Sequence, residues 1–200
     1  GIARNERNAS GSLKTLATVE PDLISNDRDG NKIRDFWTGD VAGLYCMTSA
    51  ATPGNTDPPL KLCEATIAAA DTAPLADGAA EGEYAAISKF APQGPKSGVW
   101  YFALASDAAA GEAYAQDTGG TPPMGKVHNL KRFGFICYPD ALGSSGKMVF
   151  MVNEGNTMYR REPASVVKPS ASIPPGLITS PEWANWPSDA DLKAKWRTMD

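Results

Sequence analysis

The chain opens on a segment whose apolar residues recur with the period of a helix. From residue 4 onward they appear at three- and four-residue steps, which places them in one stripe along a helix. Because a helix this polar is marginal by itself, we expect it to lie on a sheet or to extend a longer helix. We assign it to residues 1–24, ended or kinked at Pro21, which lacks an N–H and clashes with the preceding turn. The apolar stripe comprises Ala9, Leu13, Leu16, Ala17 and Leu23, and the opposite face carries Arg4, Asn5, Arg7, Asn8, Ser12 and Lys14.

Later segments have the alternation and composition of strands. "GVWYFALA" (residues 98–105) is rich in β-forming residues. "RFGFICYP" alternates Phe133, Phe135 and Cys137 on one side with Gly134, Ile136 and Tyr138 on the other. "KMVFMVNEGNTMYRRE" reads as a hairpin whose Gly and Asn tolerate the positive φ of a tight turn. These patterns predict an antiparallel meander over residues 132–161, and "FWTGDVAGLYC" predicts a strand or two paired short strands.

The rest of the chain is predicted to be mostly irregular. A second helix is expected from Pro58-Pro59 to Pro74, with one apolar face that includes Cys63 and Ile67. "TPGNTDPP" and residues 75–98 read as loops. The proline-rich tail, residues 163–200, is expected to wrap the surface as extended coil. A capping box, Ser188 and Asp191, should open a short final helix that runs through Trp196. Trp183, Trp186 and Trp196 either pin this tail to the core or stack on sugars.

Together these elements predict the α+β class, with an N-terminal amphipathic helix packed on an antiparallel sheet. We expect a single domain over residues 1–200, divided into the helix (1–24), a region of helix, loop and sheet (25–162) and the proline-rich tail (163–200). The composition agrees with a folded chain, since 42% of residues are hydrophobic and 21% are charged.

Charge and cysteine content narrow the class of protein. The net charge is −4 and no run of Lys or Arg occurs, which argues against nucleic acid as a partner. No apolar stretch approaches the roughly 18 residues of a membrane span. The three cysteines fit no metal or redox motif. They are either three small buried side chains, or a Cys46–Cys63 disulfide with Cys137 free, which would indicate an oxidising compartment.

Little in the sequence indicates catalysis. His128, the single histidine, has no nucleophile or carboxylate cluster beside it along the chain, so we expect an ordinary surface or half-buried side chain. We identify no catalytic residue and expect that the protein is not an enzyme.

One acidic turn is a candidate metal site. Asp27, Asp29, Asn31 and Asp35 alternate around Gly30, and calcium takes six to eight oxygen ligands. The Ile33 carbonyl would add another ligand. The spacing is not that of an EF-hand, and the same residues also suit a turn whose side chains cap their own backbone. Calcium is therefore the one cofactor considered, and both interpretations stay open.

Three blocks resemble a known group of proteins. "NERNASGSLKTLATVE", "NDRDGNKIRDFWTGDVAGLY" and "FGFICYPDALGSSGKMVFMVNEGNTMYRRE" are similar to type IV pilin-like, or pseudopilin-like, envelope proteins of planctomycete-type bacteria. Members begin with a prepilin leader and a long apolar helix, whose soluble half corresponds to residues 4–20 here. The prepilin signature is absent from this sequence, so the resemblance implies a soluble domain lacking its N-terminal hydrophobic helix. Pro21 and the proline-rich tail depart from the family pattern.

The resemblance implies a structural role. The expected function is that of a non-enzymatic pilin-like or type II secretion pseudopilin-like subunit, which assembles with other subunits through the N-terminal helix. The expected location is the periplasm or the cell surface, with membrane anchoring through the missing N-terminal segment. The alternative is a secreted module that binds calcium or a glycan.

Overall fold

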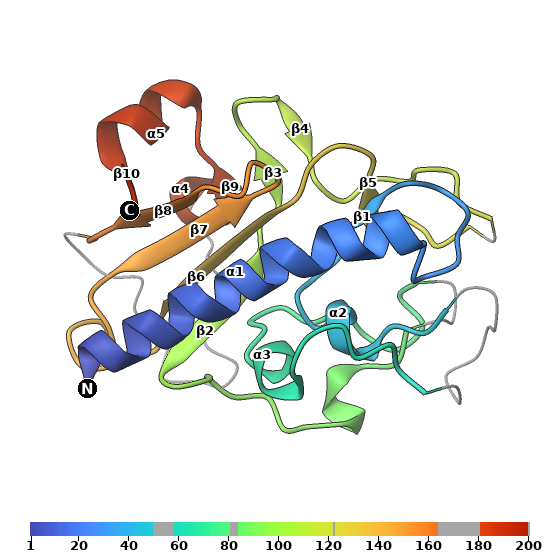
Figure 1. Cartoon of the computed structure of the whole chain (residues 1–200), viewed down its shortest axis with the longest axis horizontal. Helices are drawn as coiled ribbons and strands as arrows, with labels where there is room; N and C mark the ends of the chain where they lie inside the picture. The colour runs from blue at the N-terminus through green and yellow to red at the C-terminus, as the bar shows by residue number, and fades with distance from the viewer. Residues whose placement is uncertain (50–57, 81–83, 122, 164–180, 200) are drawn as a thin grey trace.

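The molecule is built around a five-stranded antiparallel sheet crossed on one face by a long helix (Figure 1). The computed structural model describes residues 1–49, 58–80, 84–121, 123–163 and 181–199. The helix is α1 (Ile2–Asn26). The sheet has the order β10 (Arg197–Thr198), β8 (Met158–Arg161), β7 (Val149–Asn153), β6 (Gly134–Pro139) and β2 (Val99–Ala103). The predicted α+β class, with an N-terminal helix and an antiparallel sheet, is confirmed.

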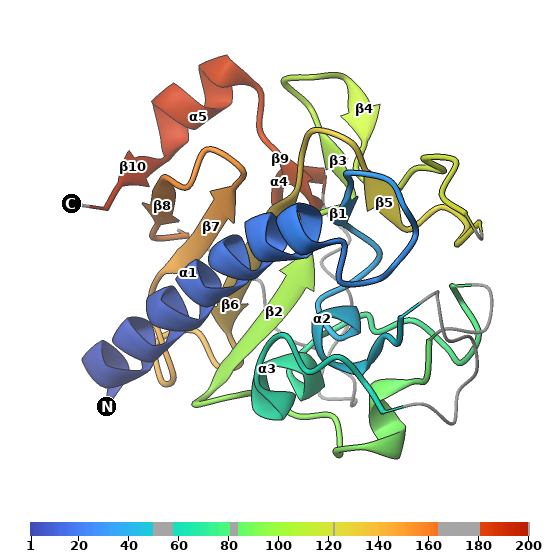
Figure 2. The same ribbon diagram turned by 45° about the vertical axis from the view of Figure 1, so that its right-hand side comes forward.

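Short elements surround this sheet. A two-stranded ladder joins β1 (Phe36–Trp37) to β5 (His128–Asn129). A second small sheet has the order β4 (Glu112–Ala113), β3 (Ser106–Asp107) and β9 (Asn185–Trp186). Figure 2 shows the short helices α2 and α3 beyond the β2 side of the main sheet, and α5 on the β8 side. The remaining helical elements are α2 (Gly43–Cys46), α3 (Ala65–Ala69), the 3₁₀ turn η1 (Ile87–Lys89), α4 (Pro181–Ala184) and α5 (Asp189–Lys195). No helix in the described ranges is long and apolar enough to cross a membrane.

Helix α1 buries the apolar stripe that the sequence predicts, but it departs from the prediction in where it ends and in the side that Ser12 faces. The helix does not end at Pro21; it runs on to Asn26 and closes at Asp27, whose φ is 45°. A proline inside a helix costs about 3 kcal/mol, and here apolar contacts on both sides of it, at Leu16 and Leu23, offset that cost. Ser12 faces the core rather than solvent, and its hydroxyl accepts a hydrogen bond from Lys96 at 3.0 Å.

The main sheet separates two hydrophobic cores, as the alternation in β6 predicts. Phe135 and Cys137 face α1, and Ile136 and Tyr138 face the opposite core. Three tail tryptophans close that second core with exposures of only 4–8%: Trp183, Trp186 and Trp196. The interpretation that they pin the tail to the protein is confirmed, and they present no sugar-stacking surface.

The strand predicted in "FWTGDVAGLYC" is confirmed as β1, whereas the helix predicted from Pro58 was too long. The segment after Trp37 forms no second strand; it turns into the short helix α2. The helix expected from Pro58 shrinks to the five residues of α3, because the chain before it is extended. There, the Leu60 N–H donates to the Met47 carbonyl at 2.9 Å and the Leu62 N–H to the Leu44 carbonyl at 2.7 Å. The greater part of the predicted loop "TPGNTDPP" lies outside the described residues.

The last part of the tail is more regular than predicted. Residues 164–180 lie outside the described ranges, but 181–199 contain α4, β9, α5 and β10 rather than coil. The predicted cap of α5 is confirmed, since the Ser188 hydroxyl accepts from the Asp191 N–H at 3.2 Å. Acidic residues in the first turn and lysines in the last complement the helix dipole. The helix ends at Lys195, one residue earlier than predicted, and the chain then adds β10 to the sheet.

The β2 edge of the main sheet is covered. The Tyr101 N–H donates to the Ala70 carbonyl at 2.9 Å, and the Thr72 N–H donates to the Tyr101 carbonyl at 3.0 Å. The chain after α3 thus satisfies backbone groups that β2 would otherwise present to solvent. At the opposite edge lies β10, where Arg197 stands opposite Arg160 in the register with β8.

The cysteines are free and buried, so the disulfide alternative is not realised. Burial raises the pKa of the Cys46 and Cys63 thiols to about 12, which suppresses the reactive thiolate. We therefore expect iodoacetamide at pH 8 to leave the native protein unmodified and to add three groups in urea without reductant, as read by intact mass. Fewer than three additions in urea would show that a bridge forms.

Two glycines should respond oppositely to alanine. A Cβ at Gly43 would lie 2.3 Å from the Trp37 ring, whereas nothing lies within 4 Å of a Cβ at Gly11. We expect Gly43→Ala to lower the free energy of unfolding by about 1–3 kcal/mol through overpacking. Gly11→Ala should raise it by about 0.5–1 kcal/mol, because alanine is the better helix former. Urea unfolding of both variants tests this, and equal effects would contradict the packing described.

Candidate functional site: a buried Asp–Asp–His cluster

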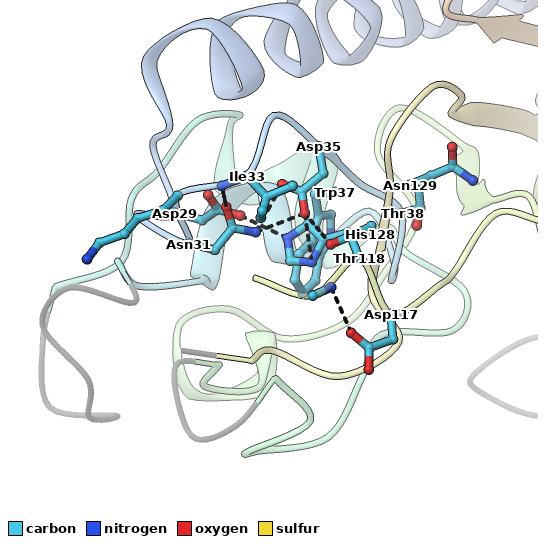
Figure 3. A network of polar contacts seen from close by, with 12 residues as sticks. Asp29, Asn31, Ile33, Asp35, Trp37, Thr38, Asp117, Thr118, His128 and Asn129 are labelled. Carbon is cyan, nitrogen blue, oxygen red and sulfur yellow. Dashed lines mark hydrogen bonds and ion pairs between the residues drawn. The ribbon is translucent and has the colours of Figure 1, made fainter. Parts of the chain in front are cut away.

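The loop between α1 and β1 turns three polar side chains inward. Three of its residues have positive φ: Asp27 (45°), Gly30 (67°) and Lys32 (64°). This winding buries Asp29, Asn31 and Asp35 almost completely, while the residues between them remain largely at the surface. The acidic turn thus directs three polar side chains into the protein interior (Figure 3).

The turn meets His128 on β5, a residue distant in sequence. The Nε2 atom of His128 lies 2.8 Å from the Oδ2 of Asp29, and its Nδ1 lies 3.8 Å from the Oδ2 of Asp35. The side chains of these three residues, the Asp–Asp–His cluster, are 0–2% exposed. One donor atom from each lies within 4.8 Å of the others. A carboxylate therefore faces each nitrogen of the ring (Figure 3).

Neighbouring side chains fix the orientation of Asp35. The Asn31 Nδ2 donates to both of its oxygens, at 2.9 and 3.0 Å, and the Thr118 hydroxyl donates to Oδ2 at 2.6 Å. Asn31 is itself held, because its Oδ1 accepts from the Ile33 N–H at 3.0 Å. The Asn31 backbone carbonyl accepts from Thr121 at 2.8 Å. Asp35 thus has one defined rotamer supported from two loops.

The backbone pairing of β1 and β5 places His128. Trp37 is its partner in the register, and the two rings meet edge to face with centroids 5.5 Å apart. On the other side, the Gln116 N–H donates to the His128 carbonyl at 2.7 Å and the His128 N–H to the Gln116 carbonyl at 3.2 Å. The imidazole is therefore fixed by the β1–β5 ladder, by the isolated bridge to Gln116 and by one aromatic contact.

Glu20 of α1 borders this cluster. Its Oε1 accepts from the Trp37 N–H at 2.9 Å, and its buried Oε2 has no hydrogen-bond partner. Burial raises the Glu20 pKa well above 4.5, and the charges of Asp29 and Asp35 raise it further. Burial also raises the pKa of Asp29, against the hydrogen bond from His128. The buried region thus holds more carboxylic groups than cationic partners.

The predicted metal-site residues have unequal places in this geometry. Asp29 and Asp35 come together, whereas Asp27 lies outside their group: its Oδ2 accepts from the Lys32 N–H at 3.1 Å, and its buried Oδ1 has no hydrogen-bond partner. Asn31 turns its amide nitrogen, not its oxygen, toward Asp35. The Ile33 carbonyl accepts from the Asp35 N–H at 3.1 Å. Several of the oxygens expected to bind calcium are therefore used within the turn.

The expectation for His128 was wrong, because it is buried at 1% exposure and contacts carboxylates. It lies 99 residues from Asp29 along the chain, so no local motif could reveal the pairing. Two carboxylates and an imidazole that converge without solvent are suited to holding a proton or a cation.

A second buried pair, Asp40 and Asp71, serves the fold. Asp40 accepts from the Trp37 indole at 3.1 Å, from the backbone of Gly43 and Leu75, and from the Tyr84 hydroxyl. Burial and the charge of Asp40 raise the Asp71 pKa to about 7. A cavity of about 240 Å³ reaches both residues, but every carboxylate oxygen accepts a protein hydrogen bond. The three donors to Asp71 are the backbone N–H groups of Val41, Ala42 and Ala73.

The unpartnered Glu20 oxygen predicts a pH effect. A carboxyl with a raised folded-state pKa stabilises the protein below its unfolded value, about 4.5, and this contribution is lost as pH rises through the folded value. Glutamine does not titrate and keeps an acceptor for Trp37. In the presence of a chelator, which removes any bound metal, Glu20→Gln should therefore gain stability relative to wild type as pH rises from 4.5 to 8.

Urea unfolding at pH 4.5 and 8 measures this difference. The control is Glu162→Gln, a change at an exposed carboxylate, which should leave the pH dependence as in wild type. If Glu20→Gln loses the same stability at both pH values, Glu20 is not the titrating group.

The chain matches no protein-family model, no curated protein and no solved structure.

Proposed function

We propose that this chain is the soluble domain of a non-enzymatic, pilin-like structural subunit that assembles through its N-terminal helix. The observation that carries the proposal is the long helix α1, which lies along an antiparallel sheet with one face buried and the other exposed (Figure 1). This arrangement follows the element order implied by the sequence resemblance.

The exposed face of α1 has features of a contact surface. Its exposed positions from residue 4 to 18 recur at helical spacing and include three cations and no acid, in a chain of net charge −4. An acidic surface on a neighbouring subunit would complement this stripe. Two hollows of about 490 and 480 Å³ lie beside the helix and share Gly11 and Lys14 in their lining. The exposed stripe comprises Arg4, Arg7, Asn8, Gly11, Lys14, Thr15 and Thr18.

The chemistry of the interior supports a non-enzymatic role. In the described chain, the Asp–Asp–His cluster and the Asp40–Asp71 pair are both buried, and their hydrogen bonds hold loops to strands. The tail tryptophans are buried too, so they give no support to the glycan-binding alternative. On this proposal the domain belongs to the cell envelope, and an apolar segment upstream of Ile2 would anchor it and join the assembly.

Charge reversal on the helix tests assembly. In the natural gene product in its own cells, Arg4→Glu with Arg7→Glu should abolish multimers captured by a cysteine placed at Thr15, an exposed α1 position, because the basic stripe would then repel its acidic partner. The measurement is oxidative cross-linking followed by non-reducing gel electrophoresis.

The matched control reverses Lys193 on α5, which is also exposed, and should leave the cross-linked ladder intact. A second control moves the introduced cysteine from position 15 to position 193, where no cross-linked multimers are expected. Cross-linking that is unchanged by the double reversal, or equal from position 193, would overturn assembly through α1.

A further inference from the structure

We propose that Asp29, Asp35 and His128 bind one divalent transition-metal ion of the kind that accepts mixed imidazole and carboxylate ligands, such as Zn²⁺. The ion would join the turn after α1 to β5, two segments that no local sequence motif connects. This inference is independent of the proposed assembly function, since a structural ion would serve any role of the domain.

The spacing of the donor atoms suits such an ion. Metal–ligand bonds to Zn²⁺ are about 2.0–2.2 Å for nitrogen and oxygen, so donors around one ion lie roughly 3–4.5 Å apart. The three donor atoms lie within 4.8 Å of one another. The 3.8 Å between the His128 Nδ1 and Asp35 falls within this range and is too long for a hydrogen bond. The 2.8 Å between Nε2 and Asp29 is a hydrogen-bond distance, so coordination by Asp29 would replace that bond.

The surroundings of the histidine match those of a metal ligand. Ligating histidines usually donate their second ring N–H to a carboxylate or carbonyl, which fixes the tautomer. Here both ring nitrogens face carboxylates, Nε2 at 2.8 Å from Asp29 and Nδ1 at 3.8 Å from Asp35, so an ion on either nitrogen would have a carboxylate beside it. Asn31 and Thr118 in turn hydrogen-bond Asp35, as outer partners of a ligating carboxylate do.

Charge balance supplies the independent observation. Glu20 is 0% exposed, lies beside the cluster through its bond to Trp37, and leaves Oε2 unpartnered. No lysine or arginine within the described ranges forms an ion pair with Glu20, Asp29 or Asp35. Buried carboxylates without cationic partners either take up protons or attract a metal.

The donor set favours a transition metal over calcium. Calcium requires six to eight oxygens, but the Asn31 amide oxygen and the Ile33 carbonyl are engaged within the turn. The Asp27 Oδ1 is buried and has no hydrogen-bond partner, but Asp27 is not part of the converging group. That group is two carboxylates and one imidazole, and imidazole suits zinc and its neighbours.

The single histidine gives a direct test. The chain is labelled with ¹⁵N-histidine, stripped with chelator and titrated with Zn²⁺, both when folded and during refolding from urea because the cluster is buried. We expect one equivalent to shift the imidazole nitrogen resonances and to raise the Tm, and the same concentration of Ca²⁺ to do neither. Unmoved resonances in the presence of excess Zn²⁺, or a response to Ca²⁺ alone, would overturn the proposal.

Ligand variants extend the test. Asp35→Asn and His128→Gln should weaken Zn²⁺ binding at least 10-fold by calorimetry, whereas Asp117→Asn, at a nearby exposed aspartate, should not. Circular dichroism tests whether each variant is folded. If one is not, the Zn²⁺ titration of the wild-type His128 resonances still tests the proposal. The assay uses the purified chain, so its failure leaves the cross-linking test of α1 untouched.

Discussion

The position of Trp37 organises the molecule. Its backbone N–H bonds Glu20 of α1, its indole N–H bonds Asp40, and its ring stacks on Tyr84 with centroids 5.8 Å apart and planes 7° apart. Its edge-to-face contact with His128 places the imidazole beside the acidic turn. One two-residue strand thus joins the long helix, α2 and the Asp–Asp–His cluster. A displacement of the Trp37 ring would therefore affect the long helix, α2 and the Asp–Asp–His cluster together.

The sequence predicts best those elements whose pattern is long and local. The stripe of α1 and the alternation of β6 are repeated often enough to fix both the element and its buried face. The cap of α5 is a local hydrogen bond, and it too is foreseen. Prediction failed where tertiary packing outweighed a local preference. The helix passes through Pro21 because it is packed before and after it, and the segment after Pro58 stays extended because it pairs with residues 44–47.

The sequence indicates the acidic turn of the candidate site but not the residues that it meets. The acidic turn stands out through its alternating Asp and Asn residues, but their roles depend on the directions of their side chains. Asn31 looks like a ligand in the sequence and is a support for Asp35 in the structure. His128 looks isolated because its partners arrive through the β1–β5 pairing, a contact across about ninety residues. Glu20 reads as a polar residue on a helix, and only the packing of α1 shows that it is buried.

The protection of the sheet edges limits the addition of strands from other chains. Exposed strand edges invite other chains to add as further strands. The β2 edge is closed by the chain around Ala70 and Thr72, and the β10 edge is only two residues long and bears Arg197 opposite Arg160. A very short edge strand that carries an arginine is a poor template for an added strand. The domain can therefore be crowded against copies of itself without its sheet becoming a template for fibrils.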